Sequence, residues 1–178
     1  MNDFLPSQVW KYCPYCGVES FRAGDDNYMQ CGACQKKYYI NAAAAVACVI
    51  ESPKGEILFT RRAFEPSKGM LDLPGGFVDL DETAEDAAKR EIREELNVEA
   101  VSVQYIGCSP NRYLYGGIVY YTLDLGFKCL VEDFTNMQVA DDVDGYVFLP
   151  QNQINFQDIS FPSIRNILQV YFAQKSRD

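Results

Sequence analysis

The chain has no histidine among its 178 residues. This absence excludes a Ser-His-Asp triad, a Cys-His pair, a histidine-ligated zinc ion and catalysis by an imidazole acid or base. Any general base must therefore be a carboxylate, a lysine, a tyrosine or a thiolate.

Basic residues are also scarce, with 16 Lys and Arg against 25 Asp and Glu and a formal charge of −9. Surfaces that bind nucleic acid normally carry clustered Lys and Arg, so we do not expect nucleic acid as a partner. The longest apolar run, residues 42–50, has nine residues, whereas a membrane-spanning helix needs about 20. The N-terminus lacks the basic and apolar regions of a secretory signal, and we expect a cytoplasmic protein.

Four of the seven cysteines form two Cys-x-x-Cys pairs, Cys13 with Cys16 and Cys31 with Cys34, separated by 14 residues. An odd total disfavours a disulfide framework, and four thiolates at such spacing form a tetrahedral shell that suits zinc. A closed shell of four ligands leaves no open position, so this ion would be structural. The other cysteines, Cys48, Cys108 and Cys129, lie among apolar residues and are expected in the core.

These features predict two domains, an N-terminal zinc ribbon over residues 1–41 and a larger domain over residues 42–178. The ribbon balances four basic residues against four acidic ones. Two roles remain open for it: it extends the fold or a dimer interface, or it contacts nucleic acid or protein.

The larger domain has the pattern of a mixed α+β fold. Strands are expected at residues 44–51, 56–62, 101–108, 118–127 and 146–149. Helices are expected at residues 83–96 and 163–173. Thr83 has the side chain to cap the first helix, and Asn97 suits the left-handed position that ends it.

Residues 79–99 hold nine acidic and three basic residues, which is two thirds of the net charge. A solvated helix face is the usual meaning of such a run. At about 100° per residue, however, Glu91 and Glu95 lie on the stripe of Ala84 and Ala88, which should face the fold. Carboxylates beside a packed face repel one another unless a cation compensates, and oxygen ligands suit Mg²⁺ or Mn²⁺. The helix is therefore a candidate metal site.

The run Gly76-x5-Glu82-x7-Arg90-Glu91-Ile92-x-Glu94-Glu95-x-Asn97-Val98 resembles the Nudix box of the Nudix hydrolase superfamily. Asn97 replaces the glycine of that pattern, and the other fixed positions match. The resemblance implies an α/β/α sandwich with a mixed sheet, and hydrolysis of a nucleoside diphosphate linked to another group. Homodimers are common in this superfamily.

The resemblance also implies roles for single residues. Glu91, Glu94 and Glu95 would bind catalytic Mg²⁺ or Mn²⁺, with the Gly75 carbonyl as a further ligand. Arg90 would orient a box glutamate, and Glu82 would support the network of metal and water. Some members place the base outside the box, and the candidates here are Asp142 first, then Asp141 and Asp144. A solvated acidic turn is the alternative reading of those three.

Joined to a four-cysteine ribbon, the box resembles zinc-ribbon Nudix enzymes, which include NADH pyrophosphatases and relatives acting on ADP-ribose or FAD. NADH pyrophosphatases carry a Ser-Gln-Pro-Trp type motif after the box, whereas residues 108–113 read Cys-Ser-Pro-Asn-Arg-Tyr and the only tryptophan is Trp10. Residues 154–164 look more like the ADP-ribose and FAD relatives. Candidate substrate contacts are an arginine for phosphate and an aromatic ring for adenine, from Arg61, Arg62, Phe64 and Tyr113.

The leading hypothesis is thus a metal-dependent pyrophosphatase that cleaves an ADP-ribose- or FAD-type molecule to AMP and a phosphorylated moiety. An NADH or NAD pyrophosphatase is the alternative within the same class. A non-catalytic Nudix ligand sensor, whose ribbon binds nucleic acid or protein, is the alternative from another class.

Overall fold

The computed structural model describes residues 5–24, 27–140 and 143–176. The chain forms two compact units. The first combines Met1–Ala43 with Arg112–Tyr121, and the second combines Ala44–Asn111 with Thr122–Asp178. Among the described helices, none is long and apolar enough to cross a membrane.

The N-terminal unit begins with a short helix, α1 (Pro6–Val9), and contains a three-stranded antiparallel sheet. Its strands are β1 (Phe21–Ala23), β2 (Tyr28–Cys31) and β3 (Lys37–Tyr39), in the order β1-β2-β3. A small core of four buried side chains fills one side of the sheet: Cys13, Phe21, Met29 and Cys31. With so few buried groups, we expect this unit to depend on its cysteines for stability, as other very small domains depend on metals or disulfides.

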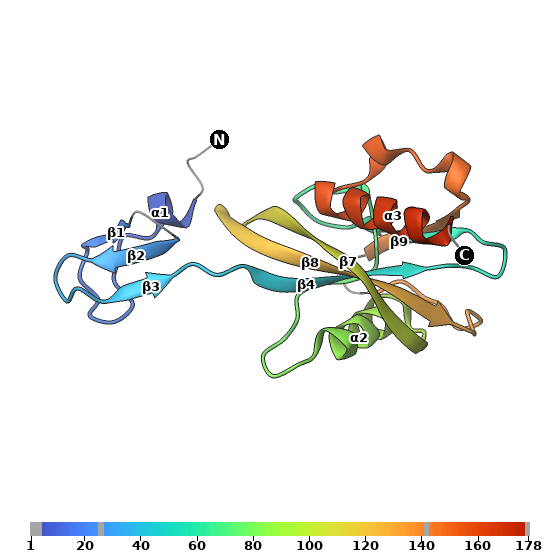
Figure 1. Ribbon diagram of the computed structural model, residues 1–178, viewed down its shortest axis with the longest axis horizontal. Helices are drawn as coiled ribbons and strands as arrows, with labels where there is room; N and C mark the ends of the chain where they lie inside the picture. Colours follow the sequence, from blue (N-terminus) through green and yellow to red (C-terminus); the bar gives the residue numbers. More distant parts are fainter. Residues whose placement is uncertain (1–4, 25–26, 141–142, 177–178) are drawn as a thin grey trace. The chain divides into compact units, whose positions relative to one another are not determined.

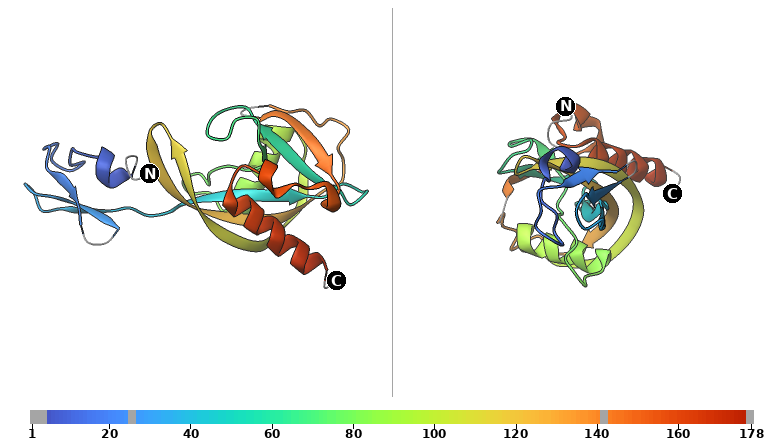
Figure 2. Two further views of the ribbon diagram at one scale, coloured as in Figure 1. Left: turned by 90° about the horizontal axis from the view of Figure 1, so that it is seen from above. Right: turned by 90° about the vertical axis from the view of Figure 1, so that its left-hand side faces the viewer.

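The larger unit contains two three-stranded sheets and two main helices. One sheet has the order β4 (Ala43–Ile50), β8 (Ile118–Val131), β7 (Ala100–Tyr115), and the other β6 (Leu71–Asp72), β5 (Ile57–Arg62), β9 (Val143–Leu149). The helices are α2 (Ala84–Leu96) and α3 (Pro162–Lys175), and two short 3-10 turns, Gln151–Gln153 and Phe156–Asp158, precede α3. The helices lie on opposite sides of the sheets (Figures 1 and 2). The expected α/β/α sandwich is confirmed.

Strand β4 shows why the sandwich has two cores. Successive side chains of a strand point to opposite faces. Val46, Cys48 and Ile50 accordingly join the core under α2, whereas Ala47 and Val49 join the core under α3. Because all five are buried, β4 forms the centre of the fold and positions whatever packs along it.

The sequence predicted both helices to within two residues at each end, but it predicted the two longest strands too short. Strands β7 and β8 run on beyond residues 108 and 127, and the tip of their hairpin groups with the N-terminal unit. Side chains there alternate without a continuous apolar face, so the pattern gave no sign of the extension.

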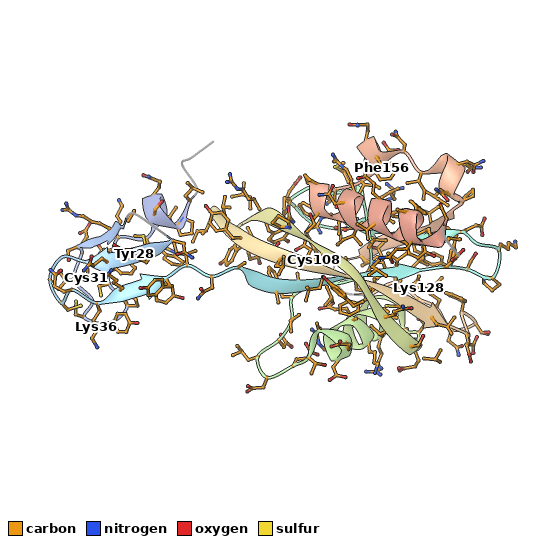
Figure 3. All side chains as sticks on the ribbon, viewed as in Figure 1. Tyr28, Cys31, Lys36, Cys108, Lys128 and Phe156 are labelled. Atoms are coloured by element: carbon orange, nitrogen blue, oxygen red, sulfur yellow. The ribbon has the colours of Figure 1, made fainter. Side chains whose placement is uncertain are left out.

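The expectation that Cys108 lies in the core is wrong, whereas Cys48 and Cys129 are buried as expected. Strict alternation from the buried Ile106 would turn Cys108 inward. The next buried residue of β7 is instead Ser109. Its hydroxyl accepts a hydrogen bond from the Asn166 side-chain amide on α3 at 3.0 Å. The exposed Cys108 lies on β7 (Figure 3).

Candidate active site and metal centre

The glycine pair before α2 lies in an extended loop that is clamped along β4. Backbone N–H groups of β4 donate to the Pro74 and Gly76 carbonyls, each at 2.8 Å. Gly75 has φ +150°, and a Cβ there would lie 2.1 Å from the Val46 carbonyl oxygen. Only glycine can bring the backbone this close to β4, so the loop has a fixed path.

Helix α2 begins and ends as its sequence predicts. The Thr83 hydroxyl accepts the Asp86 backbone N–H at 3.1 Å and donates to the Asp86 carboxylate at 2.7 Å. Asn97 takes the left-handed conformation at φ 54°, and its side chain donates to the Asn136 carbonyl at 3.1 Å. Asparagine therefore replaces the glycine of the box while keeping the same backbone geometry.

The buried face of α2 carries apolar and acidic side chains together. Ala88 and Ile92 are fully buried in the core, and Glu91 and Glu95 are only 9% and 5% exposed. Glu94 points outward, with 47% of its side chain exposed. The predicted placement of Glu91 and Glu95 on the alanine stripe is confirmed.

Arg90 is the centre of the acidic group. Its guanidinium binds both carboxylate oxygens of Glu82 at 2.9 Å, and its Nη1 binds Glu91 at 2.8 Å and Glu94 at 2.9 Å. Its Nη2 also donates to the Phe77 carbonyl at 3.0 Å. One planar side chain with five donors thus fixes three carboxylates and the loop before the helix, which the compact ammonium of lysine could not do.

The same network sets the charge of its members. The hydrogen bond from Arg90 lowers the pKa of Glu82, and the bonds from Glu82 and its neighbours raise the pKa of Arg90. Both groups therefore remain ionised at neutral pH.

Two further contacts bring the buried glutamates to the glycine loop. The Gly75 N–H donates to Glu95 at 3.2 Å. A Cβ on Gly76 would lie 2.4 Å from Oε1 of Glu91. The structure thus gathers Gly75, Glu82, Arg90 and the three glutamates of α2 into one group. Hard oxygen donors, two of them buried, fit a divalent cation such as Mg²⁺ or Mn²⁺.

The three candidate bases follow a described segment that contacts the C-terminal end of α2. Asp141 and Asp142 are outside the described residues, and Asp144 is exposed on β9. The residues just before Asp141 bond to the C-terminal end of α2. The Ala140 N–H donates to the Glu95 carbonyl and the Gln138 N–H to the Leu96 carbonyl, both at 3.0 Å. These bonds satisfy carbonyls that the end of a helix leaves without partners.

The two candidate arginines at the end of β5 are already engaged. Arg61 donates to the Gly69 carbonyl at 2.6 Å, and Arg62 pairs with the buried carboxylate of Asp72 at 3.0 Å. Burial raises the pKa of Asp72, although Arg62 opposes that shift. Arg62 thus has a structural partner in Asp72, and the sequence alone gave no sign of this ion pair.

The two candidate aromatic rings belong to different units. Phe64, in the larger unit, is 63% exposed. Tyr113 is at the hairpin tip, where its ring stacks with that of Tyr115 at 6.2 Å between centroids.

The four predicted zinc ligands come together in the N-terminal unit. The Sγ atoms of Cys13, Cys16, Cys31 and Cys34 all lie within 4.8 Å of one another. This is the only such grouping of three or more acidic or thiol side chains among the described residues. The box carboxylates are more widely spaced, around the Arg90 guanidinium.

The sulfur spacing fits a tetrahedral zinc site. Cys13 and Cys34 are 3.7 Å apart, as are Cys16 and Cys31. A disulfide needs about 2.05 Å, whereas an ion about 2.3 Å from each sulfur of a tetrahedron separates the sulfurs by about 3.8 Å.

Ser20 supports this centre, and the sequence gave no signal for it. Its hydroxyl lies 3.3 Å from Sγ of Cys31, and with the Cys34 N–H it lowers the pKa of the Cys31 thiol to about 6. A metal ligand must be deprotonated, so this shift favours binding by Cys31, whereas the pKa of Cys16 is raised although a backbone hydrogen bond at Val18 opposes that shift.

Together, the fold and the site define a histidine-free α/β/α domain in which an acidic helix faces a glycine loop. The model of the NUDIX domain matches residues 41–169, so the chain belongs to the Nudix family.

Among curated proteins, the chain is similar to the NAD-capped RNA hydrolase NudC of Vibrio parahaemolyticus, with 25% identity over 75% of this chain and 51% of that protein. It is 29% identical to NudC of Shigella flexneri over 56% of this chain and 38% of that protein. The chain thus spans about half the length, or less, of these relatives.

Among solved structures, a NUDIX hydrolase from Nitrosomonas europaea superposes with a TM-score of 0.71, at 25% identity and over 94% of this chain and 93% of that one. The NUDIX domain of Shewanella oneidensis NrtR, solved with ADP ribose, superposes with a TM-score of 0.58 at 20% identity, over 77% of this chain and 88% of that one. The second likeness concerns the fold alone.

Proposed function

We propose that the protein is a metal-dependent pyrophosphatase that hydrolyses the diphosphate bond of an ADP-linked molecule to AMP and a phosphorylated moiety. The observation that carries this proposal is the Arg90 network of a Nudix family domain, in which one guanidinium holds three carboxylates and is anchored to the Phe77 carbonyl of the glycine loop.

In this proposal Glu91, Glu94, Glu95 and the Gly75 carbonyl hold Mg²⁺ or Mn²⁺. When bound, the metal neutralises the diphosphate and activates water for attack on phosphorus. Arg90 positions the carboxylates, and Glu82 fixes Arg90 through two hydrogen bonds. Asp142 stands as the candidate base, because with no histidine in the chain a carboxylate must take the proton.

The remaining assignments belong to the same proposal. Arg61, Arg62, Phe64 and Tyr113 are the candidate substrate contacts. We also propose that the four thiolates hold one structural Zn²⁺, that residues 1–41 and 42–178 are the domains, and that the protein is a cytoplasmic homodimer.

Two kinds of ADP-linked substrate remain, and each has support. Similarity to proteins named NudC favours an NAD-type substrate. The departure at residues 108–113 from the NADH pyrophosphatase motif, and the pattern of residues 154–164, favour ADP-ribose or FAD. The complete set of box residues supports catalysis over a ligand-sensing role, which an eroded box would indicate.

A substrate panel tests the proposal directly. Purified protein with Mg²⁺ or Mn²⁺ should release AMP from at least one of ADP-ribose, FAD, NADH and diadenosine polyphosphates, as measured by chromatography of the products. Preference for NADH would support the NAD-type alternative. No turnover of any member with either metal would contradict the enzymatic proposal.

Gly76→Ala should impair this activity through Glu91 alone. The new Cβ would lie 2.4 Å from Oε1 of Glu91 and displace that carboxylate. A misplacement of about 1 Å can lower a rate about a hundredfold, which is the loss we expect in kcat. Gly145→Ala is the matched control. A Cβ at this position would have no other atom within 4 Å, so the variant should retain activity. Equal kcat for both variants would argue against a role for Glu91.

A further inference from the structure

The glycine loop, here residues 73–78, is anchored at three places. Backbone N–H groups of β4 bind its middle, and Arg90 binds the Phe77 carbonyl near its end. Its first residue has an anchor of its own, because the Leu73 N–H donates to Oδ1 of Asp72 at 2.9 Å. Leu73 and Asp72 are both buried, so this bond is shielded from water. The Asp72 carboxylate therefore sets where the loop begins.

The second oxygen of this carboxylate is bound by Arg62. Nη1 of Arg62 lies 3.0 Å from Oδ2 of Asp72, and the two side chains are only 16% and 12% exposed. The Thr60 hydroxyl donates to the Asp72 carbonyl at 3.4 Å across the β5–β6 pair. Each carboxylate oxygen thus has its own donor, and the orientation of Asp72 is set by β5 on one side and by the glycine loop on the other.

Arg62 also holds the loop between β5 and β6. Its Nε donates to the Pro66 carbonyl at 2.7 Å. Its backbone N–H donates to the Met70 carbonyl at 3.1 Å, and its carbonyl accepts the Gly69 N–H at 2.8 Å. One side chain thus connects residues 63–70 with the start of the glycine loop. The planar fork of a guanidinium can make two such contacts at once, whereas an ammonium is a single point charge.

The segment before α3 covers this ion pair. Ile159 forms a parallel bridge with Leu71 of β6. Two residues further on, the ring of Phe161 lies under the Arg62 guanidinium, with Cζ 5.0 Å from the ring centroid. Residues 154–164, which the sequence singled out by their pattern, therefore enclose the pair in the fold.

We propose that Arg62 and Asp72 are a positioning pair for the proposed metal site. The pair fixes Leu73, two residues before the Gly75 carbonyl that is the candidate metal ligand. Groups that orient a ligand without touching the metal typically change metal affinity or activity about 10- to 100-fold when they are lost. This inference rests on the proposed function and gives Arg62 a part in it other than contact with phosphate.

The contacts of Arg62 favour the positioning role over a direct bond to a substrate phosphate. Its Nε and Nη1 are engaged, its guanidinium lies over Phe161, and little of the side chain reaches solvent. Breaking these bonds to reach a phosphate would also leave the buried Asp72 carboxylate without its cation, which is costly.

Binding of Mn²⁺ to the full-length, zinc-loaded protein tests this role without any substrate. Electron paramagnetic resonance of free Mn²⁺ gives the dissociation constant, and thermal unfolding reports whether each variant is folded. In Asp72→Asn the side chain has one acceptor oxygen for two donors, so either Leu73 or Arg62 loses its partner. We expect the dissociation constant for Mn²⁺ to rise about 10- to 100-fold.

A double variant separates positioning from stability. Losing one member of a buried ion pair leaves the other charge unpaired, whereas replacing both with apolar side chains is often neutral for stability. Arg62→Met combined with Asp72→Leu should therefore unfold like the unmodified chain. It should still bind Mn²⁺ about 10- to 100-fold more weakly, because the Leu73 N–H has lost its acceptor. If Asp72→Asn does not fold, this variant decides the question.

Glu99→Gln is the matched control. It makes the same change from carboxylate to amide and also removes the partner of an arginine, Arg93, whose Nη2 lies 2.7 Å from Glu99. Both side chains of that pair are more than half exposed and lie outside the Arg90 network. The control should bind Mn²⁺ like the unmodified chain.

Steady-state kinetics distinguish the two roles of Arg62. A positioning pair predicts a lower kcat in the double variant, together with its weaker Mn²⁺ binding. A raised KM with unchanged kcat and unchanged Mn²⁺ affinity would overturn the proposal in favour of a phosphate contact. A double variant with both the stability and the Mn²⁺ affinity of the unmodified chain would also overturn it, because the pair would then be structural only.

The outcomes also separate this proposal from the enzymatic one. Mn²⁺ binding that depends on the pair, in a protein that turns over no substrate, would support the pair and overturn the enzymatic proposal alone. Normal turnover by the unmodified chain, with Asp72→Asn unchanged in kcat and Mn²⁺ affinity, would overturn the pair alone. No binding of Mn²⁺ by the unmodified chain would overturn both.

Discussion

Replacing Glu94 with glutamine should nearly abolish hydrolysis while leaving the protein folded. Glu94 is the box glutamate that is most exposed and has the fewest structural contacts, since its side chain makes one ion pair, with Arg90 at 2.9 Å. The amide keeps the size of the side chain but loses the negative charge that a divalent cation needs. Loss of residues that only support a metal ligand typically costs 10- to 100-fold, so loss of a ligand should lower kcat by at least about a hundredfold.

The same helix offers a matched control for this experiment. Glu85 is exposed in the first turn of α2, and Glu85→Gln makes the same chemical change outside the Arg90 network. Both variants should change the free energy of unfolding by less than about 0.5 kcal/mol, as exposed substitutions usually do. Steady-state kinetics with product analysis and thermal unfolding measure the two effects. Full turnover in Glu94→Gln would remove this residue from the catalytic group.

Replacing Cys31 with serine should unfold the N-terminal ribbon. Cys31 is fully buried, and its Sγ lies 3.7 Å from that of Cys16 in the thiolate centre. Zinc binding contributes about 10–16 kcal/mol to the folding of small zinc-finger peptides, far more than a core of four side chains can supply. We expect about one zinc ion per chain in the unmodified protein and none in the variant, by elemental analysis.

The single tryptophan reports on this event locally. Trp10 packs against the ribbon core, and its ring meets Tyr38 edge-on at 5.7 Å between centroids. Its emission should shift to longer wavelength in Cys31→Ser, whereas far-UV circular dichroism should retain the transition of the larger unit. Cys108→Ser removes a thiol outside the zinc centre and should change neither signal. A Cys31→Ser chain with full zinc content would contradict the four-thiolate assignment.

The features that could be predicted from the sequence depend on neighbours along the chain. Thr83 and Asn97 mark the ends of α2 because capping uses side chains within one turn of the helix. The burial of Glu91 and Glu95 follows from the helical period. The cysteine cluster follows from the reach of two tight turns.

The features that could not be predicted depend on residues far apart. The carboxylates meet around Arg90, and Arg90 also reaches Phe77 across the loop, so its geometry requires the folded loop. Arg62 is engaged by Asp72 only because β5 and β6 pair. Cys108 lies outside because β7 departs from strict alternation.

The boundary between the two units has a consequence for how such a protein can be divided or assembled. Because the tip of the β7–β8 hairpin groups with the N-terminal unit, the chain crosses that boundary three times. A truncation at residue 43 would remove the four clustered cysteines but leave Arg112–Tyr121 without the rest of its unit. Adding or removing residues 1–43 at one point in the chain would therefore leave ten residues of this unit, some seventy residues away, without their partners.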